Sequence, residues 1–392
     1  MNAMKPFVGL TSRRSMLRGG VVGPGLMGAA AGLLLLGTTG VLAEDEATYV
    51  QTNLVSNVVG QATTTDPNLQ NAWGVANAPN SPLWISDNND GLSTLYDGNG
   101  NIIPLVVKIP VPPATTPPAA PTGMVWNPNS GNQFLIPNTQ SGAIFIWDTE
   151  NGTIAGWNPA VSATNAVIIV DNSNGGRNGA VYKGLAFGTN VKGNFLFATN
   201  FRAGTVEAYD INFKLTTLDG AFTDPQIPAG FAPFGIANVD GDLFVTYARQ
   251  NANKDDIVPG PGEGFVDVFS TDGELLRRFA SRGVLNAPWG VTRATFGFGR
   301  FSGDILIGNF GNAGQFAGWI NAFDNRGGLE GELRNQRGQP IAIDGLWSLV
   351  FGTFRNSDGD TLYFTAGPDN QTNGLFGKIT PAGDRDDVAA AN

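Results

Sequence analysis

Oxygen-bearing side chains recur at similar places along this chain of 392 residues. Four apolar stretches end on such a side chain, and these are Asp87, Asn138, Asn200 and Asn309. Carboxylate and carboxamide oxygens are the ligands that Ca²⁺ and Mg²⁺ prefer in proteins. The four residues therefore form a candidate metal site, with Ca²⁺ as the cofactor, if the fold brings them together. Asp and Asn also fill turns by bonding to the local backbone, and this alternative stays open.

Four further polar residues are candidates for ligand binding, and these are Asn88, Arg202, Arg249 and Asp344. The two arginines follow apolar stretches, where they would pair with an anionic ligand or with acidic neighbours on the surface. Asp344 and Asp87 would supply the two carboxylates of a general acid–base pair, provided that they converge.

The chain contains no cysteine and no histidine. Disulfide bonds, thiolate zinc sites and cysteine nucleophiles are therefore excluded. Ser-His-Asp triads and imidazole metal ligands are excluded as well. Acid–base catalysis, if there is any, falls to carboxylates.

The formal net charge is −10, which argues against nucleic acid and anionic membrane surfaces as partners. Hydrophobic residues make up 42% of the chain and charged residues 14%. This composition is enough for a large core, and one continuous repeat array can use all of it.

The first 43 residues resemble a twin-arginine export signal. The pair Arg13 and Arg14 precedes a Gly/Ala-rich apolar run over residues 19–43, and the acidic stretch that begins at Glu44 follows. We expect cleavage before Glu44, with no membrane contact afterwards; a retained anchor is the alternative. The mature chain is then expected in the periplasm or outside the cell.

A short phrase opens an apolar stretch six times. It consists of an aromatic or small residue, a glycine and an aliphatic residue. The copies lie roughly fifty residues apart, which indicates a repeat architecture. Their glycines are Gly74, Gly123, Gly184, Gly235, Gly290 and, in the loosest copy, Gly345.

Each repeat predicts four short strands bounded by Gly, Asn and Asp turns. We therefore expect an all-β fold, a six-bladed β-propeller of four-stranded antiparallel blades, over residues 44–380, with a flexible tail at 381–392. The strands expected in the second repeat are 123–126, 134–137, 143–148 and 166–170. The phrase glycines let the innermost strands crowd around the axis, because they lack a Cβ atom.

The sixth repeat lacks an outer strand. The apolar stretch from Tyr49 to Val55, at the start of the mature chain, is expected to pair there and to close the ring. An open ring would leave unpaired sheet edges.

Loops that leave second strands and loops that enter inner strands share one face of such a ring. The long loops of this chain are expected on that face, and only short turns on the other. Long loops on a rigid scaffold are where binding usually resides. Trp73, Phe234, Trp289 and Trp347 open inner strands and are expected in the core, although a stacking platform for a ligand is the alternative.

The phrase and the strands after it resemble NHL-type six-bladed propellers. The runs 71–76 and 85–88 also look like a family of exported bacterial propellers with no assigned activity. Gluconolactonase-like propellers are similar in blade number and in the Asn residues at strand ends, and this similarity implies a divalent ion. Only Asp87 supplies an acid there.

Two functions follow as expectations. The first is an exported, monomeric, non-catalytic binding protein whose loop-rich face takes an unknown protein, peptide or carbohydrate. The alternative is a lactonase-like hydrolase that depends on a divalent metal, with its site at the mouth of the central channel.

Overall fold

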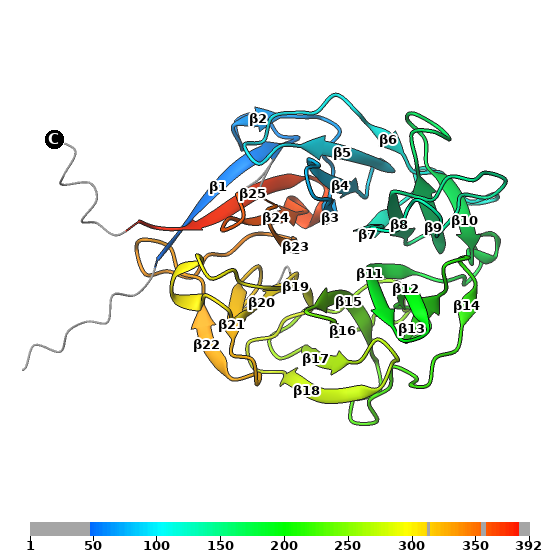
Figure 1. The fold of residues 1–392 in the computed structure, drawn as a ribbon. Coiled ribbons are helices and arrows are strands. Elements are labelled where there is room, and N and C mark those ends of the chain that lie inside the picture. The colour runs from blue at the N-terminus through cyan, green and yellow to red at the C-terminus, as the bar shows by residue number, and fades with distance from the viewer. Residues whose placement is uncertain (1–47, 312–313, 354–357, 384–392) are drawn as a thin grey trace, which may run out of the picture. The chain divides into compact units, whose positions relative to one another are not determined.

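The computed structural model describes residues 48–311, 314–353 and 358–383, and six antiparallel blades form a ring in this part of the chain (Figure 1). The six-bladed all-β propeller is therefore confirmed. The expected signal at 1–43 and most of the expected tail lie outside the described residues. Among the described residues, no helix has the length and apolarity of a membrane span.

In blades 1 to 5, the strands follow chain order from the axis outward. The first two strands of the chain, β1 and β2, belong to blade 6. Blade 1 holds β3 (Ala72–Asn77), β4 (Leu83–Asp87), β5 (Leu92–Tyr96) and β6 (Val107–Lys108). Blade 2 holds β7 (Pro121–Trp126), β8 (Phe145–Thr149), β9 (Thr153–Trp157) and β10 (Val167–Asp171). Blade 3 holds β11 (Tyr182–Asn190), β12 (Gly193–Asn200), β13 (Thr205–Tyr209) and β14 (Leu215–Thr216).

Blades 4 and 5 follow the same order. Blade 4 holds β15 (Phe231–Val239), β16 (Asp242–Arg249), β17 (Gly264–Phe269) and β18 (Leu275–Ser281). Blade 5 holds β19 (Pro288–Arg293), β20 (Ile305–Asn309), β21 (Ile320–Phe323) and β22 (Leu329–Glu332).

Blade 6 combines the two ends of the described chain. Its inner strands are β23 (Leu346–Phe351), β24 (Leu362–Ala366) and β25 (Leu375–Pro381), and β1 (Tyr49–Ser56) pairs antiparallel with β25. The two-residue strand β2 (Thr64–Thr65) adds to β1 in parallel. Tyr49, Leu54 and Val55 of β1 are buried. Closure of the ring by this strand is therefore confirmed.

The glycine phrase lies where the inner strands crowd together. A Cβ atom on Gly123 would overlap the backbone of Leu185 in the next blade, and one on Gly290 would overlap the backbone carbonyl of Trp347. The pairing of inner and second strands shifts register at this level in all six blades. The absence of a side chain thus brings neighbouring blades into backbone contact.

The sixth copy of the phrase was assigned wrongly. The register shift in blade 6 falls between Leu346 and Leu349, so Ser348 rather than Gly345 occupies the glycine level. The hydroxyl of Ser348 accepts a hydrogen bond from the backbone N–H of Val75 at 3.2 Å. The last blade therefore joins the first through a side chain.

The prediction of a strand at 134–137 is also wrong. Residues 127–144 form a long connection between β7 and β8, and the expected third strand is the second one. Phe134 is buried but has a left-handed φ of 53°, which a strand does not allow. The connection lies on the face that was expected to carry only short turns, as does the segment 294–304 between β19 and β20.

Candidate functional site

The axis of the ring has two openings. The loop mouth lies where the chain enters the inner strands, beside Lys183. The hairpin mouth lies at the other end, where inner strands turn into second strands, beside Asn77 and Asn238.

Aromatic rings close the axis at the loop mouth. Trp73 and Trp347 stack with centroids 3.4 Å apart, and Phe310 stacks on Trp347 at 3.8 Å. Trp289 meets Trp347 edge to face at 6.0 Å, and Phe234 lies 5.9 Å from the same ring. All five are buried. The four that open inner strands thus form core contacts, as expected.

One cation lies among these rings. Lys183 stands one residue before its phrase glycine, and its side chain is only 2% exposed. Its Nζ lies 5.1 Å from the centroid of Trp73 and 5.9 Å from that of Phe201. It donates a hydrogen bond to Glu150 and lies 3.9 Å from Oδ1 of Asp256. A buried ammonium needs such partners, because desolvation of the charge is costly.

A chain of hydrogen bonds extends from this pair around the loop mouth. Asn88 Nδ2 donates to Glu150 Oε2 at 3.1 Å, and Asn71 Nδ2 donates to Asn88 Oδ1 at 3.1 Å. Asn71 Oδ1 in turn accepts from Trp347 Nε1 at 2.9 Å, and its Nδ2 lies 3.3 Å from Gln371 Oε1. With Lys183 and Asp256, the network joins loops and strands of blades 6, 1, 2, 3 and 4.

Asp87 does not reach this network through any described contact. It is fully buried at the end of β4, where Thr94 Oγ1 donates to its Oδ1 at 3.2 Å. Burial raises the pKa of this carboxyl well above its ordinary value. Asp344, the proposed second acid, is exposed and accepts from the backbone N–H of Asp369 at 2.8 Å. The two carboxyls thus have separate surroundings.

The three expected amide ligands have local partners or lie elsewhere. Asn309 accepts from the Asn286 N–H at 3.0 Å and donates to the Val284 carbonyl at 2.7 Å. Asn200 Nδ2 donates to Glu207 Oε1 at 2.7 Å. Asn138 is exposed, in the connection on the hairpin face rather than at the end of a second strand. Asn200 and Asn309 thus bond to neighbouring protein groups, whereas Asn138 does not lie with them.

The two arginines pair with acidic neighbours. Arg202 Nη2 lies 3.6 Å from Asp255 Oδ2, and Arg202 Nη1 donates to the Gly179 carbonyl at 2.9 Å. Arg249 lies 3.3 Å from Glu263. Within the described ranges, no group of three or more carboxylates is arranged to hold a metal ion. Of the eight candidate residues, Asn88 is the one that hydrogen-bonds within the central network.

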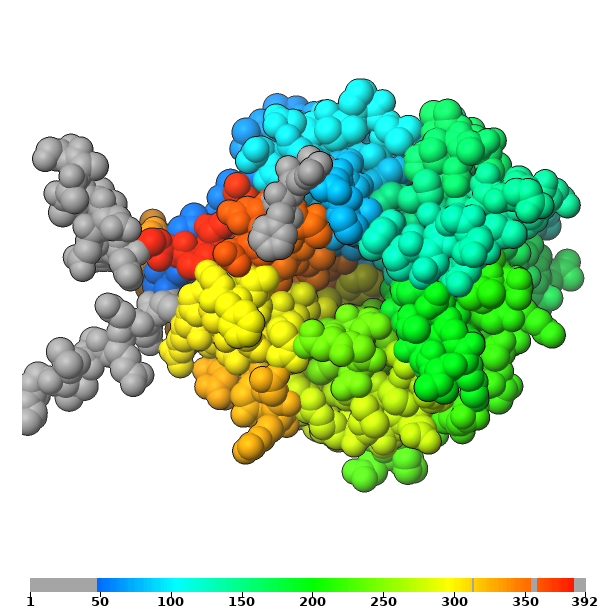
Figure 2. Space-filling view, viewed as in Figure 1, coloured from blue at the N-terminus to red at the C-terminus, as the bar shows by residue number. Residues whose placement is uncertain are grey.

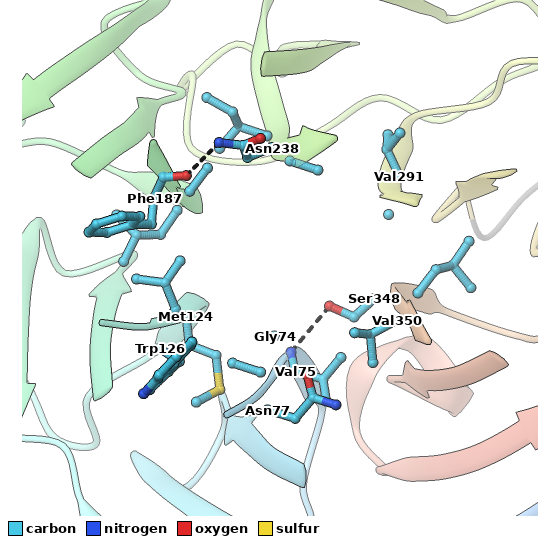
Figure 3. A pocket seen from close by; sticks show the side chains of 18 of the residues that line it. Gly74, Val75, Asn77, Met124, Trp126, Phe187, Asn238, Val291, Ser348 and Val350 are labelled. Carbon is cyan, nitrogen blue, oxygen red and sulfur yellow. Dashed lines mark hydrogen bonds between the residues drawn. The ribbon is translucent and has the colours of Figure 1, made fainter. Parts of the chain in front are cut away.

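The axis is open at the hairpin mouth. A cavity of about 350 Å³ is lined by inner-strand residues of all six blades, and Trp289 lies at its inner end. The surface is hollowed around the axis in Figure 2, and Figure 3 shows the lining side chains. The lining includes Met124, Trp126 and Phe187, and none of the described residues that form it is charged.

Sequence reasoning missed Lys183, Glu150, Asp256 and Asn71. A signal for Lys183 was present, because it stands at a position that other blades fill differently. The six residues at this position are Trp73, Thr122, Lys183, Phe234, Trp289 and Trp347. A single cation among four aromatic residues at equivalent positions marks it as special.

No family model matches the chain. It is 36% identical over 334 residues to uncharacterized protein R648 of Acanthamoeba polyphaga mimivirus, a match that covers 83% of this chain and 78% of the relative. It is 33% identical over 338 residues to uncharacterized protein L690 of the same virus, a match that covers 85% of this chain and 86% of that relative. A solved protein of unknown function from Bacteroides thetaiotaomicron shares the fold, with a TM-score of 0.53 at 11% identity over 86% of this chain and 77% of that one.

The fold expected from the NHL-type resemblance is thus confirmed as a six-bladed propeller, whereas membership of an exported bacterial family stays a prediction. On sequence, the chain belongs to the same family as these two mimivirus proteins.

Proposed function

We propose that the protein is a non-catalytic binding protein, and that the centre of the loop mouth receives a basic side chain of a peptide or protein partner. The observation that carries this proposal is the hydrogen-bonded network from Trp347 to Asp256. It ties segments of five blades into one rigid surface before any ligand arrives. A preorganised surface loses little conformational entropy on binding.

The charges at this centre favour a cationic ligand group. Glu150 and Asp256 surround a single ammonium, and their side chains are 28% and 51% exposed, whereas that of Lys183 is 2% exposed. The ammonium is therefore hidden and the carboxylates face outward. An incoming lysine or arginine would meet net negative charge.

A fluorescein-labelled hexalysine peptide tests the proposal by fluorescence anisotropy. Asp256→Asn removes one exposed carboxylate at the loop mouth and should weaken binding about two- to fivefold, as expected for an exposed ion pair. Asp219→Asn is the matched control, because Asp219 is 67% exposed and pairs with Lys192 in the β11–β12 turn of the hairpin face. Equal loss in both variants would reduce the effect to general charge attraction and reject the site.

Two other outcomes redirect the proposal. Binding on a glycan array that Asp256→Asn weakens would replace the basic partner with a carbohydrate. A rise in melting temperature with Ca²⁺ that EDTA reverses would favour the lactonase-like hydrolase instead, because a ligand that binds the folded state stabilises it.

Export is the second part of the proposal and rests on the sequence around Arg13 and Arg14. Replacement of both arginines by lysine should leave the chain in the cytoplasm of a bacterial host. The exported protein should begin at Glu44, which N-terminal sequencing checks.

A further inference from the structure

The central channel at the hairpin mouth has the features of a ligand site of its own. Its volume of about 350 Å³ lies within the range of small-molecule pockets. It is closed at the inner end by the buried aromatic rings, and it is separate from the polar network at the loop mouth.

The channel wall selects against charge. Its side chains are mainly aliphatic or aromatic, and Asn77, Asn238 and Ser348 are its polar ones. An ion would lose its hydration without gaining a counter-ion there, which is unfavourable. An apolar ligand would displace water from a surface that offers it few hydrogen bonds.

The polar side chains of the wall have protein partners or are enclosed. Asn238 is satisfied, because its Nδ2 donates to the Phe187 carbonyl at 2.9 Å and its Oδ1 accepts from the Gly241 N–H at 2.9 Å (Figure 3). Ser348 accepts from Val75. Asn77 Nδ2 is buried and has no hydrogen-bond partner among the described residues. This nitrogen is enclosed by protein atoms, so a ligand in the channel does not reach it, and the wall offers few free polar groups.

We propose that the channel binds an uncharged, mainly apolar small molecule. This site is independent of the proposed loop-mouth function. The face around it also exposes Phe296 and Val191, whose exposed fractions are 93% and 97%. Those residues could attract apolar probes to the outer surface, so they have to be controlled for.

Prodan tests the proposal, because it is an uncharged naphthalene with one ketone and a polarity-sensitive emission. Its emission should shift to the blue on saturable binding at one site per chain. Val350→Trp places a large ring at the channel wall and should weaken binding at least tenfold. Phe296→Ser removes an exposed ring outside the channel and should leave binding unchanged. The reverse pattern, or no saturable binding, would overturn the proposal.

A pair of probes gives a test that a folding defect cannot imitate, because it uses the wild-type chain. N-phenyl-1-naphthylamine, an uncharged probe, should compete with prodan for the channel. 1-Anilinonaphthalene-8-sulfonate, which is the same molecule with an added sulfonate, should not compete, because the charged group would lose its hydration in the channel. Equal competition by the two probes would overturn the proposal.

Discussion

The two mouths of the axis are built from the same six inner strands but differ in what fills them. At the loop mouth, five aromatic rings and a buried lysine occupy the centre, and hydrogen bonds connect the loops. At the hairpin mouth, the same strands leave an open, uncharged cavity. The difference arises within a few residues, on the two sides of the glycine level.

This contrast shows how one repeat can give two kinds of surface. The position before the phrase glycine carries large rings that meet on the axis, whereas the positions after it carry small or aliphatic side chains such as Val75 and Ala76. A closed polar surface and an open apolar one therefore coexist on a single scaffold. The following predictions test whether they are independent.

The largest effect is expected at the glycine level, since both mouths depend on it. Gly123→Ala places a Cβ atom against the backbone of Leu185, which cannot move without shifting a blade. The free energy of unfolding should fall by about 3 kcal/mol or more. Gly131→Ala, with open space around the new methyl group, should change it by less than about 0.5 kcal/mol. Urea denaturation measures both, and similar losses would contradict the role of the glycine level.

A smaller effect is expected from the buried cation. Lys183→Met leaves Glu150 and Asp256 without their ammonium. The free energy of unfolding should fall by about 2 kcal/mol. Lys192→Met is the matched control, because that side chain is 43% exposed, and it should cost less than about 1 kcal/mol. Prodan binding at the hairpin mouth should survive both changes. If Lys183→Met abolishes it in folded protein, the two mouths are coupled.

A third effect concerns pH. Burial raises the pKa of Asp148 to about 7, although a hydrogen bond from Thr122 opposes the shift. The folded state therefore holds more protons than the unfolded state between about pH 4 and pH 7. The stability that this group contributes is greatest at the acid end and is lost as the pH rises through about 7. Asp87 acts in the same direction.

Unfolding measured at pH 5 and pH 8 checks this prediction. Asp148→Asn should reduce the loss of stability between the two values, and an unaltered loss would refute it. The affinity of prodan should not change over this range, because the described residues that line the channel carry no ionisable side chain.

The fold was predictable because its determinants are local and repeated. A glycine phrase, an apolar strand and an Asp- or Asn-containing turn recur in nearly every blade, and β1 was identified by the strand that the last blade lacked. The prediction for blade 2 was wrong because the segment from Phe134 to Ile136 is as apolar as a strand. Phe134 in fact packs against Phe213 and Phe187 from a left-handed turn. Composition alone does not separate a buried loop from a buried strand.

The candidate site was less predictable. Asn200 and Asn309 have the right oxygens, but backbone N–H groups donate to them, and sequence does not reveal such partners. Asp256 lies far along the chain from Lys183, so only the ring geometry brings them together. Lys183 stands inside the third copy of the glycine phrase, and comparison with the equivalent residues of the other copies would have distinguished it.

The pairing of β1 with β25 has a consequence for biosynthesis. About 300 residues separate the two strands, so a nascent chain synthesised at about 10 residues per second carries β1 without its partner for roughly half a minute. A ribosome that stalls before β25 releases a product whose exposed strand edges invite aggregation or proteolysis. Only translation through the last blade completes the ring.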